Sequence, residues 1–137
     1  MTFRYHLELD SVPGETRIIG VYDKQPNGAF PTAADIFAPT NMSALQNLSN
    51  SDRFMVIFDE YVMREAGYAF IAGTAHPSYA NKIVRKFNPP LQMQYNDVGG
   101  GTIADISTGA IYFFVVSLGT TTNASLQFVS RFRYTDN

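Results

Sequence analysis

Basic side chains gather in two short stretches in the second half of the chain. Lys82, Arg85 and Lys86 fall within five positions, and Arg131 and Arg133 are two residues apart. Because neighbouring side chains on a strand point to opposite faces, Lys82 and Lys86 share one face, Arg85 takes the other, and Arg131 and Arg133 share a face of the last strand. Such rows, with Tyr and Phe nearby, can contact phosphates and stack on bases. We predict that all five bind nucleic acid, Arg85 being the weakest candidate. A solvated or subunit-contact face is the alternative.

Groups that could perform catalysis do not assemble into a site in the sequence. His6 and His76 are far apart, and neighbours on a strand such as Asp59 and Glu60 point in opposite directions. The Gly triplet at 99–101 is not followed by Lys-Ser or Lys-Thr, so it is no phosphate-binding loop. The chain has no Cys and no Gly-x-Ser-x-Gly. We expect no enzymatic activity, no cofactor and no resident metal.

Calcium is a separate case, because a hard cation needs only oxygen ligands. Three carboxylates fall in expected loops and could bind Ca²⁺ at subunit contacts, although the sequence does not predict a site: Asp97, Asp105 and Asp136.

The composition fits one domain over residues 1–137 that buries surface against other protein. Charged residues are 16% of the chain, against about 25% in ordinary soluble domains. The net charge of −2 gives no global argument for nucleic-acid binding. No run of about 18 apolar residues predicts a membrane span, and the first residues contain no apolar signal core. Without Cys, redox chemistry does not indicate a compartment.

The elements that must position the basic rows are strands. Gly20 within one of them suggests a bulge or a close backbone approach. A short helix is expected at 31–37, with Thr32 as N-cap and Asp35 in the first turn, after a turn at 25–28. Alternating or wholly apolar runs predict strands at 3–9, 17–23, 53–62, 82–87, 91–95, 110–118 (fully buried) and 126–134. About seven strands without βα alternation indicate an all-β, antiparallel sandwich or jelly roll.

Four segments, in order along nearly the whole chain, resemble the capsid proteins of small circular single-stranded DNA viruses, including geminivirus, nanovirus and circovirus-like coat proteins. The most distinctive is the Val-Tyr-Asp-Lys-Gln-Pro-Asn-Gly run at 21–28, followed by Pro31-Thr32 and Asp35-Ile36-Phe37. The others are 48–57, the basic strand with Tyr95-Asn96 at 82–97, and 110–137 with Arg131-Phe132-Arg133-Tyr134. Satellite RNA virus capsids are near relatives with the same fold.

This resemblance implies a jelly roll that self-assembles, usually as sixty copies, into an icosahedral T=1 shell around a single-stranded DNA genome. It implies a place in the virion, and in the host nucleus during assembly. Such proteins begin with an Arg/Lys-rich arm and a first strand ahead of the stretch that matches residues 3–9. We expect both to be missing here, leaving seven of the eight strands of a jelly roll.

Two other functions remain open from the residues alone. A secreted β-sandwich could bind carbohydrate through exposed Tyr61, Tyr68 or Tyr79. A small metal-dependent jelly-roll enzyme is the weaker alternative, because the two histidines are not clustered. Whether a packaged genome would be DNA or RNA is also open.

Overall fold

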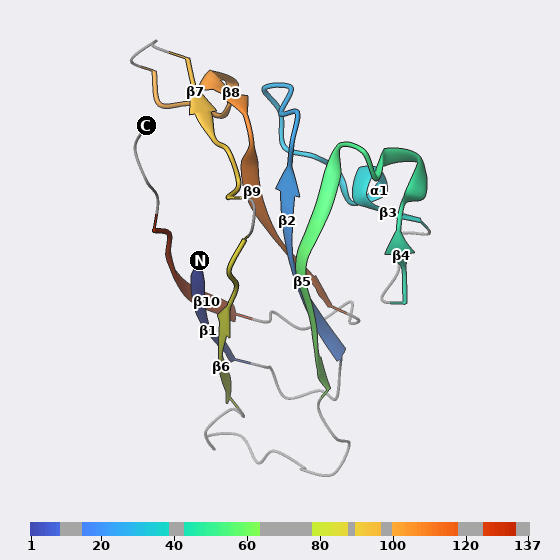
Figure 1. Cartoon of the computed structure of the whole chain (residues 1–137). Coiled ribbons are helices and arrows are strands. Elements are labelled where there is room, and N and C mark those ends of the chain that lie inside the picture. Colours follow the sequence, from blue (N-terminus) through green and yellow to red (C-terminus); the bar gives the residue numbers. More distant parts are fainter. Residues whose placement is uncertain are drawn as a thin grey trace.

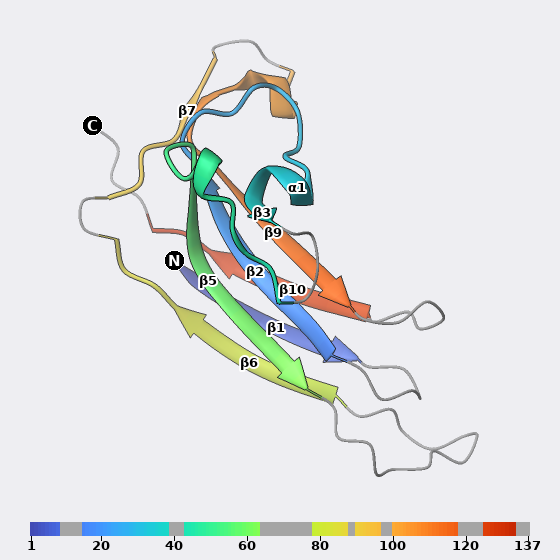
Figure 2. The same ribbon diagram turned by 90° about the vertical axis from the view of Figure 1, so that its right-hand side faces the viewer.

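Two three-stranded antiparallel sheets form the body of the protein (Figures 1 and 2). The computed structural model describes residues 1–8, 15–38, 43–63, 78–87, 90–96, 100–117 and 125–133. Sheet A has the order β10-β1-β6, made of Ser125–Arg131, Thr2–Glu8 and Ser78–Val84. Sheet B has the order β5-β2-β9, made of Phe54–Met63, Glu15–Asp23 and Ala110–Ser117. The prediction of an all-β, antiparallel protein is confirmed.

The remaining elements are short. Between β2 and β5 lie α1 (Ala33–Ile36), β3 (Phe37–Ala38), β4 (Leu45–Gln46) and the 3₁₀ turn η1 (Leu48–Asn50). Between β6 and β9 lie β7 (Gln94–Tyr95), η2 (Ile103–Asp105) and β8 (Ile106–Thr108). Thr32 caps α1 as predicted: its hydroxyl accepts from the Asp35 N–H, and the Asp35 carboxylate accepts from the Thr32 N–H in return.

Four expectations about strands are wrong in detail. The strand predicted at 126–134 ends at Arg131, because the pairing with β1 ends there at Thr2. The strand predicted at 82–87 runs from Ser78 to Val84, because pairing with β1 overrides the weak strand preference of its Ser, Ala and Asn residues. The strand predicted at 91–95 is limited to its last two residues. β9 is not fully buried: Val115 is 41% exposed, because β9 is an edge strand that pairs only with β2 among the described strands.

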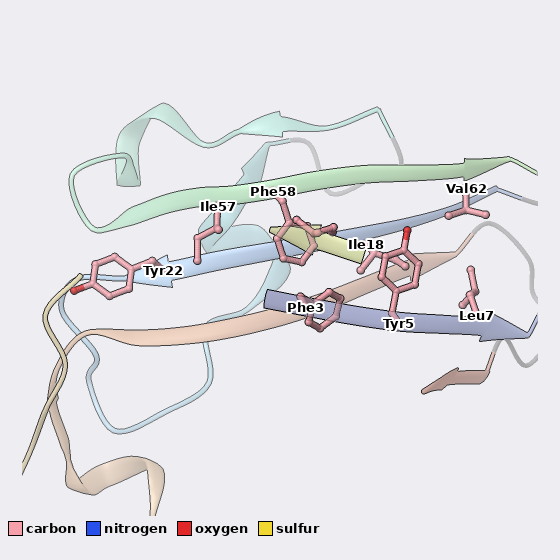
Figure 3. Packing of buried hydrophobic residues seen from close by; sticks show 9 residues of the cluster. Phe3, Tyr5, Leu7, Ile18, Tyr22, Ile57, Phe58 and Val62 are labelled. Atoms are coloured by element: carbon pink, nitrogen blue, oxygen red, sulfur yellow. The ribbon is translucent and has the colours of Figure 1, made fainter. Parts of the chain in front are cut away.

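The core lies between the two sheets (Figure 3). Phe3, Tyr5 and Leu7 extend from β1 toward sheet B, where they meet residues of β2 and β5. The facing buried residues of sheet B are Ile18, Tyr22, Ile57, Phe58 and Val62, with Ile83 added from β6. The alternation predicted for the first strand is thus confirmed, and burial of these side chains supplies the main stabilisation of the sandwich.

Gly20 provides the space that the aromatic centre of the core requires. It pairs with Phe58 on one side and Phe113 on the other, and the β2–β5 register shifts directly after it. A Cβ at Gly20 would lie 2.4 Å from the Phe58 ring. The rings of Phe58 and Phe113 both contact Phe3, with centroids 5.3 and 4.6 Å away. The register shift agrees with the predicted bulge, whereas the group that approaches Gly20 closely is an aromatic ring and not backbone.

A polar tie joins the two sheets beside this aromatic cluster. The Tyr5 hydroxyl donates to Glu60 Oε2 at 2.7 Å, and Asn81 Nδ2 donates to the same oxygen at 2.9 Å. The three residues come from β1, β5 and β6, so the carboxylate connects two strands of sheet A, β1 and β6, to sheet B. Burial and the bond to Glu60 raise the pKa of Tyr5 far above its usual value.

The outer face of sheet B is covered by the described residues 24–38 and 43–53 of the connection between β2 and β5 (Figure 1). Its buried members, Ile36, Phe37 and Ala44, pack on Ile19 and Val21 of β2. Both faces of β2 are therefore buried.

Arg17 fastens this connection to the sheet. Arg17 is only 4% exposed. Its guanidinium donates two hydrogen bonds to the carboxylate of Asp59 on β5, one of them from Nε at 2.8 Å. Its Nη1 donates to the Ala44 carbonyl at 2.8 Å. The guanidinium also lies between the rings of Phe37 and Tyr61, 5.0 and 4.9 Å from their centroids. The bonds to Asp59 raise the pKa of Arg17, so it stays charged although buried.

A second ion pair joins the two ends of the connection. Arg53 donates to both oxygens of the fully buried Asp23, at 3.0 and 2.8 Å, and the Gln25 N–H donates to the same carboxylate at 2.9 Å. The connection is therefore tied to sheet B at both of its ends as well as in its middle.

Replacing Arg17 tests how much the clamp contributes. Arg17→Met leaves the Asp59 carboxylate without its cation, and we expect a loss of roughly 2–3 kcal/mol, below the usual range for a fully buried pair because the Asp59 side chain is 31% exposed. Urea unfolding measures this, and Arg17→Met with Asp59→Leu should recover part of the loss. Lys24→Met removes an exposed cation as the control and should change stability little. A loss no larger than that of the control would contradict the assignment.

Alkaline pH should unfold the protein through its buried phenols. Burial raises the pKa of Tyr5, and also of Tyr22 and Tyr112, above the ordinary value of about 10. A group whose pKa is raised by folding stabilises the folded protein fully at pH values below the pKa it has in the unfolded chain. This contribution is lost as the pH rises through the pKa that the group has in the folded protein. Unfolding free energy should thus fall steadily above about pH 10. In Tyr5→Phe the fall should be shallower, and in Tyr95→Phe, at an exposed site, unchanged. Equal slopes in Tyr5→Phe and wild type would argue against this cause.

Candidate nucleic-acid interface

The outer face of sheet A is built by the even-numbered residues of β1 and their partners on both sides. Arg4 stands directly opposite Lys82 of β6 and Val129 of β10. One row further along, Thr2 stands opposite Val84 and Arg131. In the other direction His6 lies between Ala80 and Gln127. Since the odd-numbered residues of β1 fill the core, these rows face away from it.

The structure brings two of the five predicted residues onto this face. Lys82 and Arg131 are exposed and lie on opposite sides of β1. Lys86 and Arg133 are also exposed and follow the ends of β6 and β10, two residues beyond Val84 and Arg131. The strands end before Lys86 and Arg133, so the predicted sharing of a strand face by Lys82 with Lys86 and by Arg131 with Arg133 is wrong. The common face instead joins Lys82 and Arg131 across three strands.

Arg85 is directed elsewhere, as its alternate position predicted. Its Nε donates to the Ile57 carbonyl of sheet B at 3.3 Å, and its Nη1 to the Val84 carbonyl at 3.2 Å. Its backbone also continues the sheet by exchanging hydrogen bonds with Met1. Its guanidinium is thus held toward sheet B, away from the basic face.

Arg4 is the member of this face that the sequence reasoning missed. The alternation of residues 3–9 placed it outside the core, but a single strand does not show which strands lie beside it. Only the pairing of β1 with β6 and β10 brings Arg4 next to Lys82. The available signal was one basic residue at an outward position of a half-buried strand, which is common on any protein surface.

Two kinds of cation can be separated in the described part of the chain. Arg17, Arg53, Lys24 and Arg85 each donate to a carboxylate or a backbone carbonyl. Among the same described residues, five exposed cations have no side-chain hydrogen bond or ion pair: Arg4, Lys82, Lys86, Arg131 and Arg133. The cations without a partner are therefore those of the sheet A face and of the residues that follow its strands.

Several other sequence candidates fall elsewhere or outside the described residues. Asp105 accepts from the N–H and hydroxyl of Thr102 and caps η2. Within the described ranges no group of three His, Asp or Glu residues is placed to hold a metal ion. Outside those ranges lie His76, Tyr68, Asp97, Gly99 and Asp136.

The chain matches no protein-family model, and no curated protein is significantly similar to it. Among the helices that the structure describes, none has the length and apolar character required to cross a membrane.

The opposed cations on β1 and β6 predict an unusual response to salt. Like charges directly opposite one another in a sheet repel, so Arg4→Gln should raise the melting temperature of the nucleic-acid-free protein in low salt. The gain should fade as salt screens the repulsion. Lys24→Gln is the matched control, because that side chain donates to the Asp52 carbonyl at 2.9 Å; it should give no gain. A melting temperature for Arg4→Gln that stays level or falls in low salt would count against the repulsion.

Proposed function

We propose that this chain is a structural subunit of a small icosahedral viral capsid. In this proposal it is a jelly roll that assembles with copies of itself and places the basic face of sheet A against an enclosed single-stranded genome, most simply DNA. The role is passive and needs no catalytic group. The observation that carries the proposal is the connectivity of the six long strands.

A jelly roll is a long antiparallel hairpin of eight strands rolled into two sheets. In the hairpin the third strand pairs with the sixth and the fourth with the fifth; rolling then adds the contacts of the third with the eighth and of the fourth with the seventh. The four strand pairings of this protein fit that scheme when β1 is taken as the third strand. They are β1 with β6, β2 with β5, β1 with β10, and β2 with β9.

This assignment leaves two strands of the roll, rather than the one expected from the sequence, without a counterpart among the described strands. They would pair with β10 and β9. Inward-facing side chains are exposed at those two edges: Phe128 of β10 is 50% exposed and Val115 of β9 is 41% exposed. The corresponding side chains of the central strands β1 and β2, such as Phe3 and Ile18, are fully buried. The open side of the sandwich therefore lies where the roll would be continued.

The difference between the two outer faces supports an orientation in the shell. Residues 24–38 and 43–53 cover sheet B (Figure 1). Sheet A instead carries exposed cations that have no partner among the described residues. A genome needs cations to offset its phosphates. We therefore place sheet A on the inner side of the shell wall and sheet B with its covering connection on the outer side.

Carbohydrate binding has less support. Tyr61 is 49% exposed, but the buried guanidinium of Arg17 occupies one side of its ring. Tyr79 is 41% exposed and packs against Tyr5. Neither ring therefore has both of its faces free to stack against a sugar. A glycan array remains the direct test of this alternative.

Assembly can be tested on residues 1–137 as they stand. Size-exclusion chromatography followed by negative-stain electron microscopy should show closed particles of uniform size, and absorbance at nucleic-acid and protein wavelengths should report their content. Protein that stays monomeric at high concentration, with and without added single-stranded DNA, would contradict assembly by these residues.

Packaging is tested separately by charge reversal. Lys82→Glu with Arg131→Glu should lower the nucleic-acid content of the particles without abolishing the fold, because both side chains are exposed. Lys24→Glu, at an exposed position outside the face, is the control. Unchanged packaging in the double variant would show that these residues do not face the genome.

A further inference from the structure

We propose that Arg4 is the central contact of a phosphate-binding track on sheet A, and that this track holds the sugar–phosphate backbone of a single-stranded nucleic acid without reading its bases. The inference deepens the proposed function and rests on it for the identity of the ligand. The track consists of Arg4, Lys82 and Arg131, extended by Lys86 and Arg133.

The register of sheet A groups three cations across its three strands. Arg4 and Lys82 share one row, and Arg131 lies in the next row beside Thr2. Rows on one face are two residues apart, which is about 7 Å along a strand. Lys86 and Arg133 come two residues further in the same direction. Three cations therefore lie in two successive rows across β6, β1 and β10, close enough to contact neighbouring phosphates of one extended strand.

The unpaired state of these cations argues for an anionic ligand. Directly opposed cations such as Arg4 and Lys82 repel each other. The three rows through Thr2, Arg4 and His6, whose side chains the structure describes, contain no carboxyl residue. A phosphate bound between Arg4 and Lys82 would convert their repulsion into two charge-assisted contacts.

The side chains between the cations argue against readout of bases. Proteins that bind single strands through the bases present aromatic rings for stacking. The outward rows of sheet A carry Val84 and Val129, the latter 72% exposed, but no Phe, Tyr or Trp. The rings of β1, Phe3 and Tyr5, are turned into the core. Contacts on this face should therefore be limited to phosphate and sugar, and binding should be indifferent to sequence.

The salt dependence of binding provides a quantitative test of this inference. On single strands each phosphate contact contributes about 0.7 to the slope of log K against log salt. The three cations of the two strand rows alone should give a slope of about −2. Arg4→Gln should reduce its magnitude by about 0.7 and weaken binding at low salt.

The experiment is fluorescence anisotropy with labelled oligonucleotides of oligo-dT, oligo-dA and mixed sequence, on the whole chain across a salt series. Thermal melting confirms that each variant is folded. We expect the three oligonucleotides to bind within a few-fold of one another, and Lys24→Gln to keep the wild-type slope. Phe132→Leu, which changes an exposed ring just past the end of β10, should bind all three as the wild type does.

Three results would overturn the inference. They are an unchanged slope in Arg4→Gln, a preference of more than tenfold for one base composition, and binding to vesicles of anionic lipid in place of oligonucleotides. Particle formation is scored independently by electron microscopy. If the protein binds oligonucleotides as expected but never forms particles, only the shell proposal is contradicted. If the protein forms particles but its binding to oligonucleotides does not depend on Arg4, only this inference is contradicted.

Discussion

The two-residue alternation of β1 is the constraint on which the rest of the structure depends. Its odd positions supply Phe3, Tyr5 and Leu7 to the core, and its even positions supply Arg4 to the opposite face. As the middle strand of sheet A, β1 also fixes where β6 and β10 present their own side chains. A slip of one residue would bring Arg4 into the aromatic cluster and Phe3 to the surface. Burial of the aromatic residues therefore determines the placement of the cations.

The described cations fall into two groups, those that are paired with a carboxylate and those that have no such partner among the described residues. Arg17 and Arg53 are held by carboxylates, and they fix the β2–β5 connection to sheet B. Such pairs add little net energy over apolar packing, but removing one member is costly, so they fix the position of the segment that they join. The cations of sheet A have no such partner among the described residues and are available for a ligand.

Much of the local structure could be predicted from the sequence because it depends on local physics. The alternation of residues 3–9, the capping of α1 by Thr32 and the special role of Gly20 follow from rules that act over a few residues. Strand bounds failed where pairing overrode propensity, as in β6. Burial failed at Val115, because the run of apolar residues around it does not show that β9 is an edge strand.

The candidate site shows the same limit. Lys82 and Arg131 were found as separate basic stretches, because each stretch is visible locally. That they flank one strand, and that Arg4 lies between them, depends on pairings between residues far apart in the chain. No spacing rule in the sequence contains that information. The sequence therefore indicated which residues are basic, whereas the strand register determines which of them lie on the same face.

The pairing of β1 with β10 has a consequence for synthesis in the cell. β10 is the last of these strands to leave the ribosome, whereas all three strands of sheet B emerge before it. Domains begin to fold while the chain is being made, so sheet B can be complete while β1 still lacks one neighbour. Only at that final step does Arg131 take its place opposite Thr2, one row from Arg4. The proposed phosphate-binding track would therefore stay incomplete on the nascent chain until β10 pairs with β1.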